Sequence, residues 1–261
     1  MPEGDTVWLT ARRLDQALRH RAVTRFELRV PQLAIADLRG AVVTQVLARG
    51  KHLLMRFDHG TTLHSHLRMD GSWHISHAGR QPHAHPEHMI RAIVANADWA
   101  ATGFRVHDLR LVATLDEASL VGHLGPDLLG PDWCLDEATR RLLAAPERAL
   151  ADALLDQANV AGIGNMYLCE VLFCTRANPW SQVGDVTDVA RVLTTVQRLM
   201  LSNREHPAQS TTGLLGVGRE HWVYRRAGQP CLRCRSAIRS APQGPPGMER
   251  TRYWCPSCQP R

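Results

Sequence analysis

The sequence has no apolar run long enough to span a membrane, and it has no basic, apolar leader of the kind that directs secretion. Its first six residues instead include two acids, Glu3 and Asp5. Long repeats and low-complexity blocks are also missing, apart from a short Pro- and Gly-rich stretch at residues 241–247. These absences argue against a membrane, secreted or repeat protein, and they predict a protein of the cytoplasm.

Length and charge set the next bounds. At 261 residues the chain is long enough for two modest domains, each with its own core, and a small appendage. Lys and Arg number 31 and Asp and Glu number 25, so the formal net charge is +6. A basic chain suits a polyanionic partner such as a nucleic acid, although many basic proteins bind none.

Hydrophobic spacing predicts one helix followed by a β-rich half. Val7, Ala11, Leu14 and Leu18 share one helical face, which predicts a helix that is capped by Asp5. Short strands are expected at residues 42–46, 53–57, 61–66, 92–95 and 109–115, with a hairpin turn at 58–60. Together they predict an antiparallel β-sandwich or barrel with a leading helix.

Beyond a turn at 125–127 the pattern becomes helical. Helices are expected near residues 136–144, 146–156, 164–175 and 185–202, and Pro146 suits the first position of its helix. A tight turn at 157–163 makes two of them a helix-turn-helix pair. The expected fold class is α+β with several domains: a β-sandwich at 1–125, a helical domain at 126–222 and a cysteine module at 223–261.

Four of the seven cysteines form two C-x-x-C pairs, Cys231 with Cys234 and Cys255 with Cys258, separated by twenty residues. This spacing predicts one tetrahedral Zn²⁺ held by four thiolates, with no position left for water, so the metal is structural. Disulfides are disfavoured in a reducing compartment. The other three, Cys134, Cys169 and Cys174, are expected to be small buried residues.

The N-terminus offers a candidate nucleophile. Because Pro2 is small, removal of Met1 is expected, and Pro2 then carries a free secondary amine. Such an amine titrates near pH ~8, so part of it is neutral at physiological pH. Attack on an aldehyde-like carbon gives a cationic iminium ion, and Glu3 beside it could move protons. The alternative is that Pro2 and Glu3 are ordinary second and third residues.

Three motifs together resemble the formamidopyrimidine/endonuclease VIII family of DNA glycosylases. They are Pro2-Glu3-Gly4, the run Leu154-Leu-Asp-Gln157 followed by Val160-Ala-Gly-Ile-Gly-Asn165, and the four-cysteine module. Intermediate fragments also look like the family: Arg49-Gly50-Lys51, His66-Leu-Arg-Met69, His123-Leu-Gly-Pro126-Asp127 and Val223-Tyr-Arg-Arg-Ala-Gly228. The resemblance covers nearly the whole chain and favours the endonuclease VIII branch.

The resemblance implies a β-sandwich, a helix-two-turn-helix domain and a zinc finger in a monomer that acts on double-stranded DNA with oxidised bases or abasic sites. It implies a bifunctional glycosylase and abasic-site lyase of base-excision repair, located with the nucleoid in the cytoplasm. In this reading Pro2 attacks C1′ and the strand is cut by β,δ-elimination, while Glu3 assists ring opening. Lys51 contacts a phosphate beside the lesion, although without the family it is one surface lysine among others.

Four further DNA contacts follow from the same resemblance. Asn165, at a helix start, and Arg250, in the zinc hairpin, hold phosphates, although Asn165 could also be a plain helix cap. Met69 fills the gap left by the flipped nucleotide, or else simply packs in the protein. Arg110 opposes the orphaned base.

The sequence also departs from the family. Asp5 and Thr6 stand where the commoner start has Pro and Glu, and residues 211–224 form a shorter segment than the one that folds over an oxidised purine. These differences favour oxidised pyrimidines as substrates, with 8-oxoguanine and formamidopyrimidine specificity as the alternative. A non-catalytic binder of damaged DNA and a zinc-ribbon transcription factor are the competing functions, but neither has a chemical need for Pro2 and Glu3.

Overall fold

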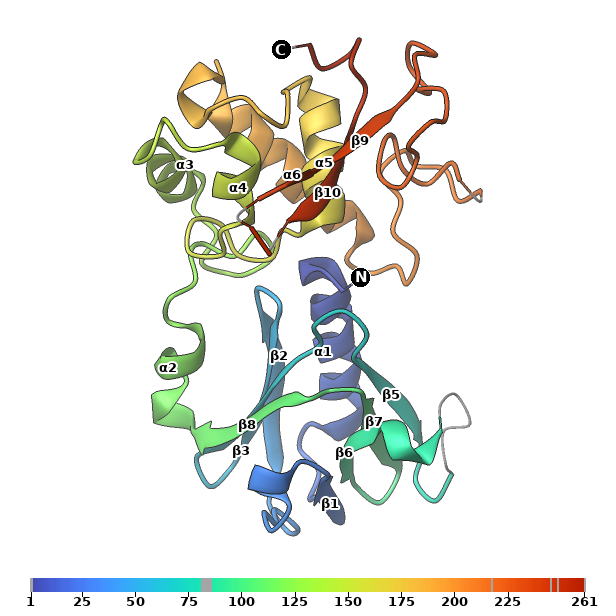
Figure 1. Cartoon of the computed structure of the whole chain (residues 1–261). Helices are drawn as coiled ribbons and strands as arrows, with labels where there is room; N and C mark the ends of the chain where they lie inside the picture. The colour runs from blue at the N-terminus through green and yellow to red at the C-terminus, as the bar shows by residue number, and fades with distance from the viewer. Residues whose placement is uncertain (1, 81–85, 217, 245, 248, 261) are drawn as a thin grey trace. The chain divides into compact units, whose positions relative to one another are not determined.

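The computed structural model describes residues 2–80, 86–216, 218–244, 246–247 and 249–260, and the statements that follow concern these residues. The chain divides into two compact units, one ending at His123 and the other beginning at Leu124. Figure 1 labels most of the helices and strands of both units. In the described part of the chain, no helix combines the length and apolar character needed to cross a membrane.

The first unit is a helix followed by two antiparallel four-stranded sheets (Figure 1). One sheet has the order β1-β6-β7-β5, with β1 at Arg25–Leu28, β6 at Ile90–Ala95, β7 at Trp99–Phe104 and β5 at Ser72–His77. The other has the order β2-β3-β4-β8, with β2 at Val43–Arg49, β3 at His52–Phe57, β4 at Thr61–His66 and β8 at Asp108–Ala113. Both sheets share one apolar core with the leading helix, α1 (Gly4–Leu18), so the predicted sandwich is confirmed.

The helix α1 begins two residues earlier than the sequence suggested. Its predicted stripe is buried, from Val7 to Leu18. The residue in the cap position is Glu3, whose backbone is extended, whereas Asp5 lies inside the first turn and accepts the Thr6 backbone N–H at 2.8 Å. The prediction that Asp5 caps the helix was therefore wrong, because capping requires the extended backbone that Glu3 has.

All five predicted strands are present: β4 has the predicted bounds, and each of the other four is shifted at one end or both. Strands β3 and β4 form the predicted hairpin around the turn at 58–60. The predicted last strand ran too far, because β8 stops at Ala113 and a 3-10 turn, η3 (Thr114–Asp116), leads into α2 (Ala118–Val121). Strands β1, β5 and β7 were missed. The alternation in β5 is short, because only Trp73 and Ile75 are apolar, and both are half-buried against the core.

The second unit packs four helices around one core and adds a two-stranded antiparallel hairpin (Figure 1). Its elements are α3 (Leu135–Leu143), α4 (Leu150–Leu155), α5 (Asn165–Thr175), η4 (Val183–Asp185), α6 (Val189–Asn203), β9 (Arg239–Gln243) and β10 (Arg250–Trp254). Short 3-10 turns in the first unit complete the list, η1 at Pro31–Leu33 and η2 at Glu87–Met89.

Two helix starts in this unit differ from the prediction. Pro146 does not begin a helix, because α4 starts only at Leu150. The backbone of residues 146–149 instead pairs with residues 181–184: the Val183 N–H donates to the Arg148 carbonyl at 3.0 Å, and the Gly184 N–H donates to the Pro146 carbonyl at 2.8 Å. The start of α6 moves from 185 to Val189, where Asp188 caps it.

The three remaining cysteines differ in burial. Cys169 is buried as expected, whereas Cys174 is only partly buried. Cys134 is exposed, because it occupies the extended position before α3, outside the buried face of that helix. The expectation that it is buried was wrong.

Candidate functional site

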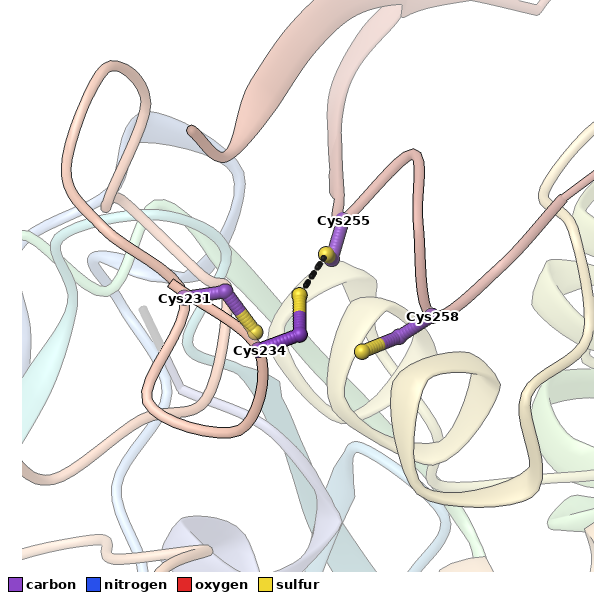
Figure 2. A group of neighbouring side chains, drawn as sticks. All are labelled: Cys231, Cys234, Cys255 and Cys258. Carbon is purple, nitrogen blue, oxygen red and sulfur yellow. Dashed lines mark hydrogen bonds between the residues drawn. The ribbon is translucent and has the colours of Figure 1, made fainter. Parts of the chain in front are cut away.

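The four cysteines of the two C-x-x-C pairs converge on one point (Figure 2). Their sulfur atoms all lie within 4.8 Å of one another, and the Cys234 and Cys255 sulfurs are 3.3 Å apart. Four thiolates at ~2.3 Å from a central Zn²⁺ would be separated by about 3.8 Å, so the donor set fits this ion. Burial, followed by the neighbouring Cys234 and Cys255 thiols, raises the pKa of Cys258 to about 12. A bound cation would offset that opposition to thiolate formation.

The cluster is attached to the helical unit by a small core of its own. Phe173 and Cys169 of α5 pack with Val223, Ile238 and the buried ligands Cys231 and Cys255. Each knuckle is closed by backbone bonds, the Arg235 N–H to the Cys231 carbonyl at 3.0 Å and the Gln259 N–H to the Cys255 carbonyl at 2.9 Å. The cysteine hairpin is therefore fixed against α5.

The side chain of Gln157 bridges the turn before α5. Its amide nitrogen donates to the carbonyls of Leu155 and Ile163, at 2.9 and 3.0 Å, and its oxygen accepts the Gly162 N–H at 3.0 Å. Gly162 has a φ of +102°, a conformation that L side chains rarely adopt. The run quoted from the sequence thus sets the direction in which α5 begins.

Asn165 is the first residue of α5, and the cap position belongs to Gly164, so Asn165 is not the helix cap. Its side chain instead reaches the cysteine hairpin. The amide nitrogen donates to the Thr251 carbonyl at 2.9 Å, and the amide oxygen accepts from the Arg252 guanidinium. Arg250, the other predicted phosphate contact of this unit, is exposed on the same strand, β10.

Sequence reasoning missed Arg252, which looks like one more basic residue of the hairpin. The structure buries it to 1% exposure. Besides Asn165, its guanidinium donates to the Gln243 side-chain oxygen at 3.1 Å and to an Asp152 carboxylate oxygen at 3.3 Å. Burial lowers the pKa of Arg252 from its ordinary value. No signal in the sequence separates this arginine from its exposed neighbours.

Glu170 was also missed. This carboxylate on α5 is fully buried and accepts the backbone N–H groups of Trp222, Val223 and Tyr224 at 2.7, 2.9 and 2.9 Å, together with the Thr211 hydroxyl. It therefore anchors both ends of the segment 211–224.

In the first unit, the start of α1 lies at the same end as the turn between β2 and β3. The His20 N–H donates to the Val43 carbonyl, and an Asp15 oxygen accepts the Val46 N–H at 2.7 Å, so the end of α1 lies beside the beginning of β2. The two elements run in opposite directions. The chain rises ~1.5 Å per residue along α1 and ~3.3 Å per residue along β2, so the first residues of α1 and the last residues of β2 lie at the same end of the unit. Pro2 and buried Glu3 precede α1 there, and Met1 lies outside the described residues.

Lys51 lies in that turn. Arg49 pairs with His52, so Gly50 and Lys51 form a two-residue hairpin loop, and Gly50 has a φ of +58° as such loops require. Lys51 is half-buried and close to His66: burial first, then Arg68 and Lys51, lower the pKa of His66 to about 4, against the opposing effect of Asp108. The Lys51 ammonium and the end of β4 thus lie together.

Met69 follows β4 at this end of the sheet and is 68% exposed, so it does not pack in the core. Its neighbour Arg68 is held by an ion pair to Asp108 at 2.6 Å. Arg110 is exposed on β8 opposite His64, two positions further from this end than the pair of Asp108 with His66. The structure therefore brings Lys51 and Met69 to the end where α1 starts, and Arg110 lies further along the sheet.

A histidine cluster beside Lys51 was not foreseen. His52 and His64 approach to 2.8 Å between ring nitrogens, and the rings of His66 and His123 lie 4.9 and 6.2 Å from that of His52. Burial, followed by the other histidines, lowers the pKa of His52 to about 3. Burial also lowers the pKa of His64 and His66, so these two imidazoles and that of His52 are neutral at physiological pH.

A sandwich with a leading helix, followed by a turn-linked helix pair and a four-cysteine hairpin, defines the class of helix-two-turn-helix proteins with a cysteine finger. The chain belongs to the formamidopyrimidine-DNA glycosylase family. Residues 1–125 match the family model of the formamidopyrimidine-DNA glycosylase N-terminal domain, and residues 124–212 match that of the formamidopyrimidine-DNA glycosylase H2TH domain. The resemblance found in the sequence is thus confirmed.

Two relatives match almost the whole chain. A probable endonuclease 8 2 from Streptomyces coelicolor is 50% identical over 99% of this chain and 94% of its own length. A DNA-(apurinic or apyrimidinic site) lyase, Nei2, from Mycolicibacterium smegmatis is 45% identical over 99% of both. The formamidopyrimidine-DNA glycosylase of Lactococcus lactis, in a crystal structure with DNA containing an abasic site, has a TM-score of 0.82 and 21% identity over all of both chains, and it shows the shared fold.

Proposed function

We propose that this protein is a bifunctional DNA glycosylase and abasic-site lyase of base-excision repair, which removes oxidised bases and cuts the strand through a Schiff base on Pro2. The observation that carries the proposal is the placement of Pro2 and Glu3 before α1, at the end of the sandwich that also bears Lys51 and Met69. Family membership and the names of the two relatives support it.

In the proposed reaction the Pro2 nitrogen forms a bond to C1′ of the damaged nucleoside, and the bond from C1′ to the base breaks. The base leaves with a proton, the sugar ring opens, and the iminium ion remains on Pro2. Loss of a proton from C2′ then breaks the bond from C3′ to oxygen, and a second elimination breaks the bond from C5′ to oxygen. Glu3 supplies and accepts protons in these steps, and Lys51 places a positive charge beside a phosphate.

The cysteine cluster holds one structural Zn²⁺ in this proposal. Cys231, Cys234, Cys255 and Cys258 fill all four tetrahedral positions, so the ion stabilises the hairpin and takes no part in the chemistry. We assign phosphate contacts to Arg250, exposed on that hairpin, and to Asn165 at the start of α5. Met69 would fill the gap in the duplex, and Arg110 would face the orphaned base.

The proposed domains are a catalytic sandwich at 1–125, a helix-two-turn-helix domain at 126–222 and a zinc hairpin at 223–261. The proposed substrate is double-stranded DNA with oxidised pyrimidines or abasic sites, bound by a monomer in the cytoplasm. The short segment 211–224, with Leu214 and Leu215 exposed, supports a preference for pyrimidines because it offers little cover for a larger base.

Borohydride trapping tests the proposal. The protein is incubated with a duplex containing dihydrouracil or an abasic site, and borohydride reduces the iminium ion to a stable amine. Peptide mapping should place the sugar on Pro2, and a variant that retains an N-terminal tag should bind the duplex without being trapped. Duplex binding by the untagged protein without any adduct would instead support a non-catalytic damage-binding protein.

A further inference from the structure

The hairpin that carries the exposed Arg250 also carries a buried arginine, Arg252. Arg250 and Arg239 are exposed, whereas Arg252 is 1% exposed and lies against α5. A buried guanidinium costs free energy unless it is fully hydrogen-bonded. Here three acceptors from three elements meet it: Asp152 of α4, Asn165 of α5 and Gln243 of β9.

We propose that Arg252 is a positioning residue for DNA binding, because its guanidinium sets the orientation of the Asn165 side-chain amide. The inference rests on the proposed function, since it takes Asn165 as a phosphate contact. Arg252 itself is enclosed by protein and does not touch DNA.

The orientation follows from the chemistry of the two partners. A guanidinium can only donate hydrogen bonds and a backbone carbonyl can only accept them. The Asn165 oxygen must therefore face Arg252 and its nitrogen must face the Thr251 carbonyl, at 2.9 Å. A flipped amide would set donor against donor and acceptor against acceptor. The second N–H of the amide is then directed away from Thr251 and can serve a phosphate oxygen at the start of α5.

The hydrogen bonds of Arg252 to Asn165, Gln243 and Asp152 explain why a charged residue occupies this buried position. A neutral side chain could fill the volume, but only a multiple donor meets Asn165, Gln243 and Asp152 together. Asp152 is 30% exposed and supplies a partial counter-charge at 3.3 Å.

A double-mutant cycle tests the proposal on the full-length zinc-loaded protein, with a duplex carrying a tetrahydrofuran abasic analogue. Asn165→Ala and Arg252→Met should each weaken binding by about 10-fold, as expected for the loss of one well-oriented bond to a charged group. The double variant should be no weaker than about twofold below the weaker single variant, because both changes remove one interaction. Arg252→Lys should recover part of the loss. Arg239→Met, which removes an exposed charge from the same hairpin, is the matched control and should combine additively with Asn165→Ala.

Salt titrations separate positioning from direct contact. Arg250→Met should reduce the slope of log affinity against log salt by ~0.9, whereas Arg252→Met should leave it unchanged. The inference would be overturned if Arg252→Met lowered the melting temperature but left the affinity for the duplex within twofold. It would also be overturned if the fold losses of affinity of the two single variants multiplied in the double variant. If the unaltered protein binds and is trapped on Pro2, such a result refutes only the role of Arg252. If the unaltered protein neither binds nor is trapped, the proposed function fails first.

Discussion

Glu170 should contribute more to stability than any exposed acid, and Glu170→Gln measures how much. The carboxylate is fully buried and its two oxygens accept from four donors, the N–H groups of Trp222, Val223 and Tyr224 and the Thr211 hydroxyl. Glutamine keeps the shape but turns one oxygen into a donor. Whichever way the amide points, at least one buried backbone N–H loses its acceptor.

The expected cost can be built from these contacts. One unsatisfied buried N–H costs ~1–3 kcal/mol, and the remaining bonds lose the strengthening that a charged acceptor gives, so we expect about 3 kcal/mol in total. For a unit of this size that corresponds to a fall in melting temperature of roughly 10 °C. Urea and thermal unfolding would measure it, with the exposed Glu147→Gln as the control. A Glu170→Gln protein that melts within ~2 °C of the unaltered chain would refute the reasoning.

Two further predictions concern the histidine cluster and the cysteine cluster. His52 and His66 have pKa values lowered to about 3 and about 4, so the unfolded chain takes up protons below pH ~6.5 that the folded form excludes. The first unit should therefore lose stability as the pH falls from about 6.5 towards 4, by about 2 kcal/mol at pH 5, and His52→Gln should flatten this dependence in urea unfolding. Cys231→Ser should lower the zinc content and weaken binding to abasic duplex by about 10-fold or more, whereas trapping at saturating protein should persist and the exposed Cys134→Ser should change neither.

The features that the sequence predicted well are those that residues close together in the chain determine. The C-x-x-C pairs fix two ligands each, and the pairs meet because β9 and β10 are antiparallel. The stripe from Val7 to Leu18 predicts α1, and the hairpin turn at 58–60 follows from its residues alone. Gln157 was part of a recognised run, but its role in closing the turn before α5 required the three distances around its amide.

The wrong and missed predictions concern features that depend on residues far apart in sequence. Pro146 is well suited to begin a helix, yet residues 146–149 pair with residues 181–184, a choice that depends on segments far apart in sequence. The histidine cluster depends in the same way on strand register, which places His52 opposite His66. Local propensity cannot decide such cases, because tertiary pairing competes with it at similar free energy.

Arg252 shows most clearly what the sequence alone cannot predict. By sequence alone, Arg250 and Arg252 are equivalent basic residues on one strand, and net charge makes both of them candidates for binding phosphate. The fold separates them: Asn165, 86 positions before Thr251, is joined to it by a hydrogen bond, and the buried Arg252 guanidinium donates to the oxygen of the same amide. The count of positive charges therefore overstates the number of phosphate contacts. Of the two arginines on β10, Arg250 is exposed and available to DNA, whereas the buried Arg252 orients the Asn165 amide.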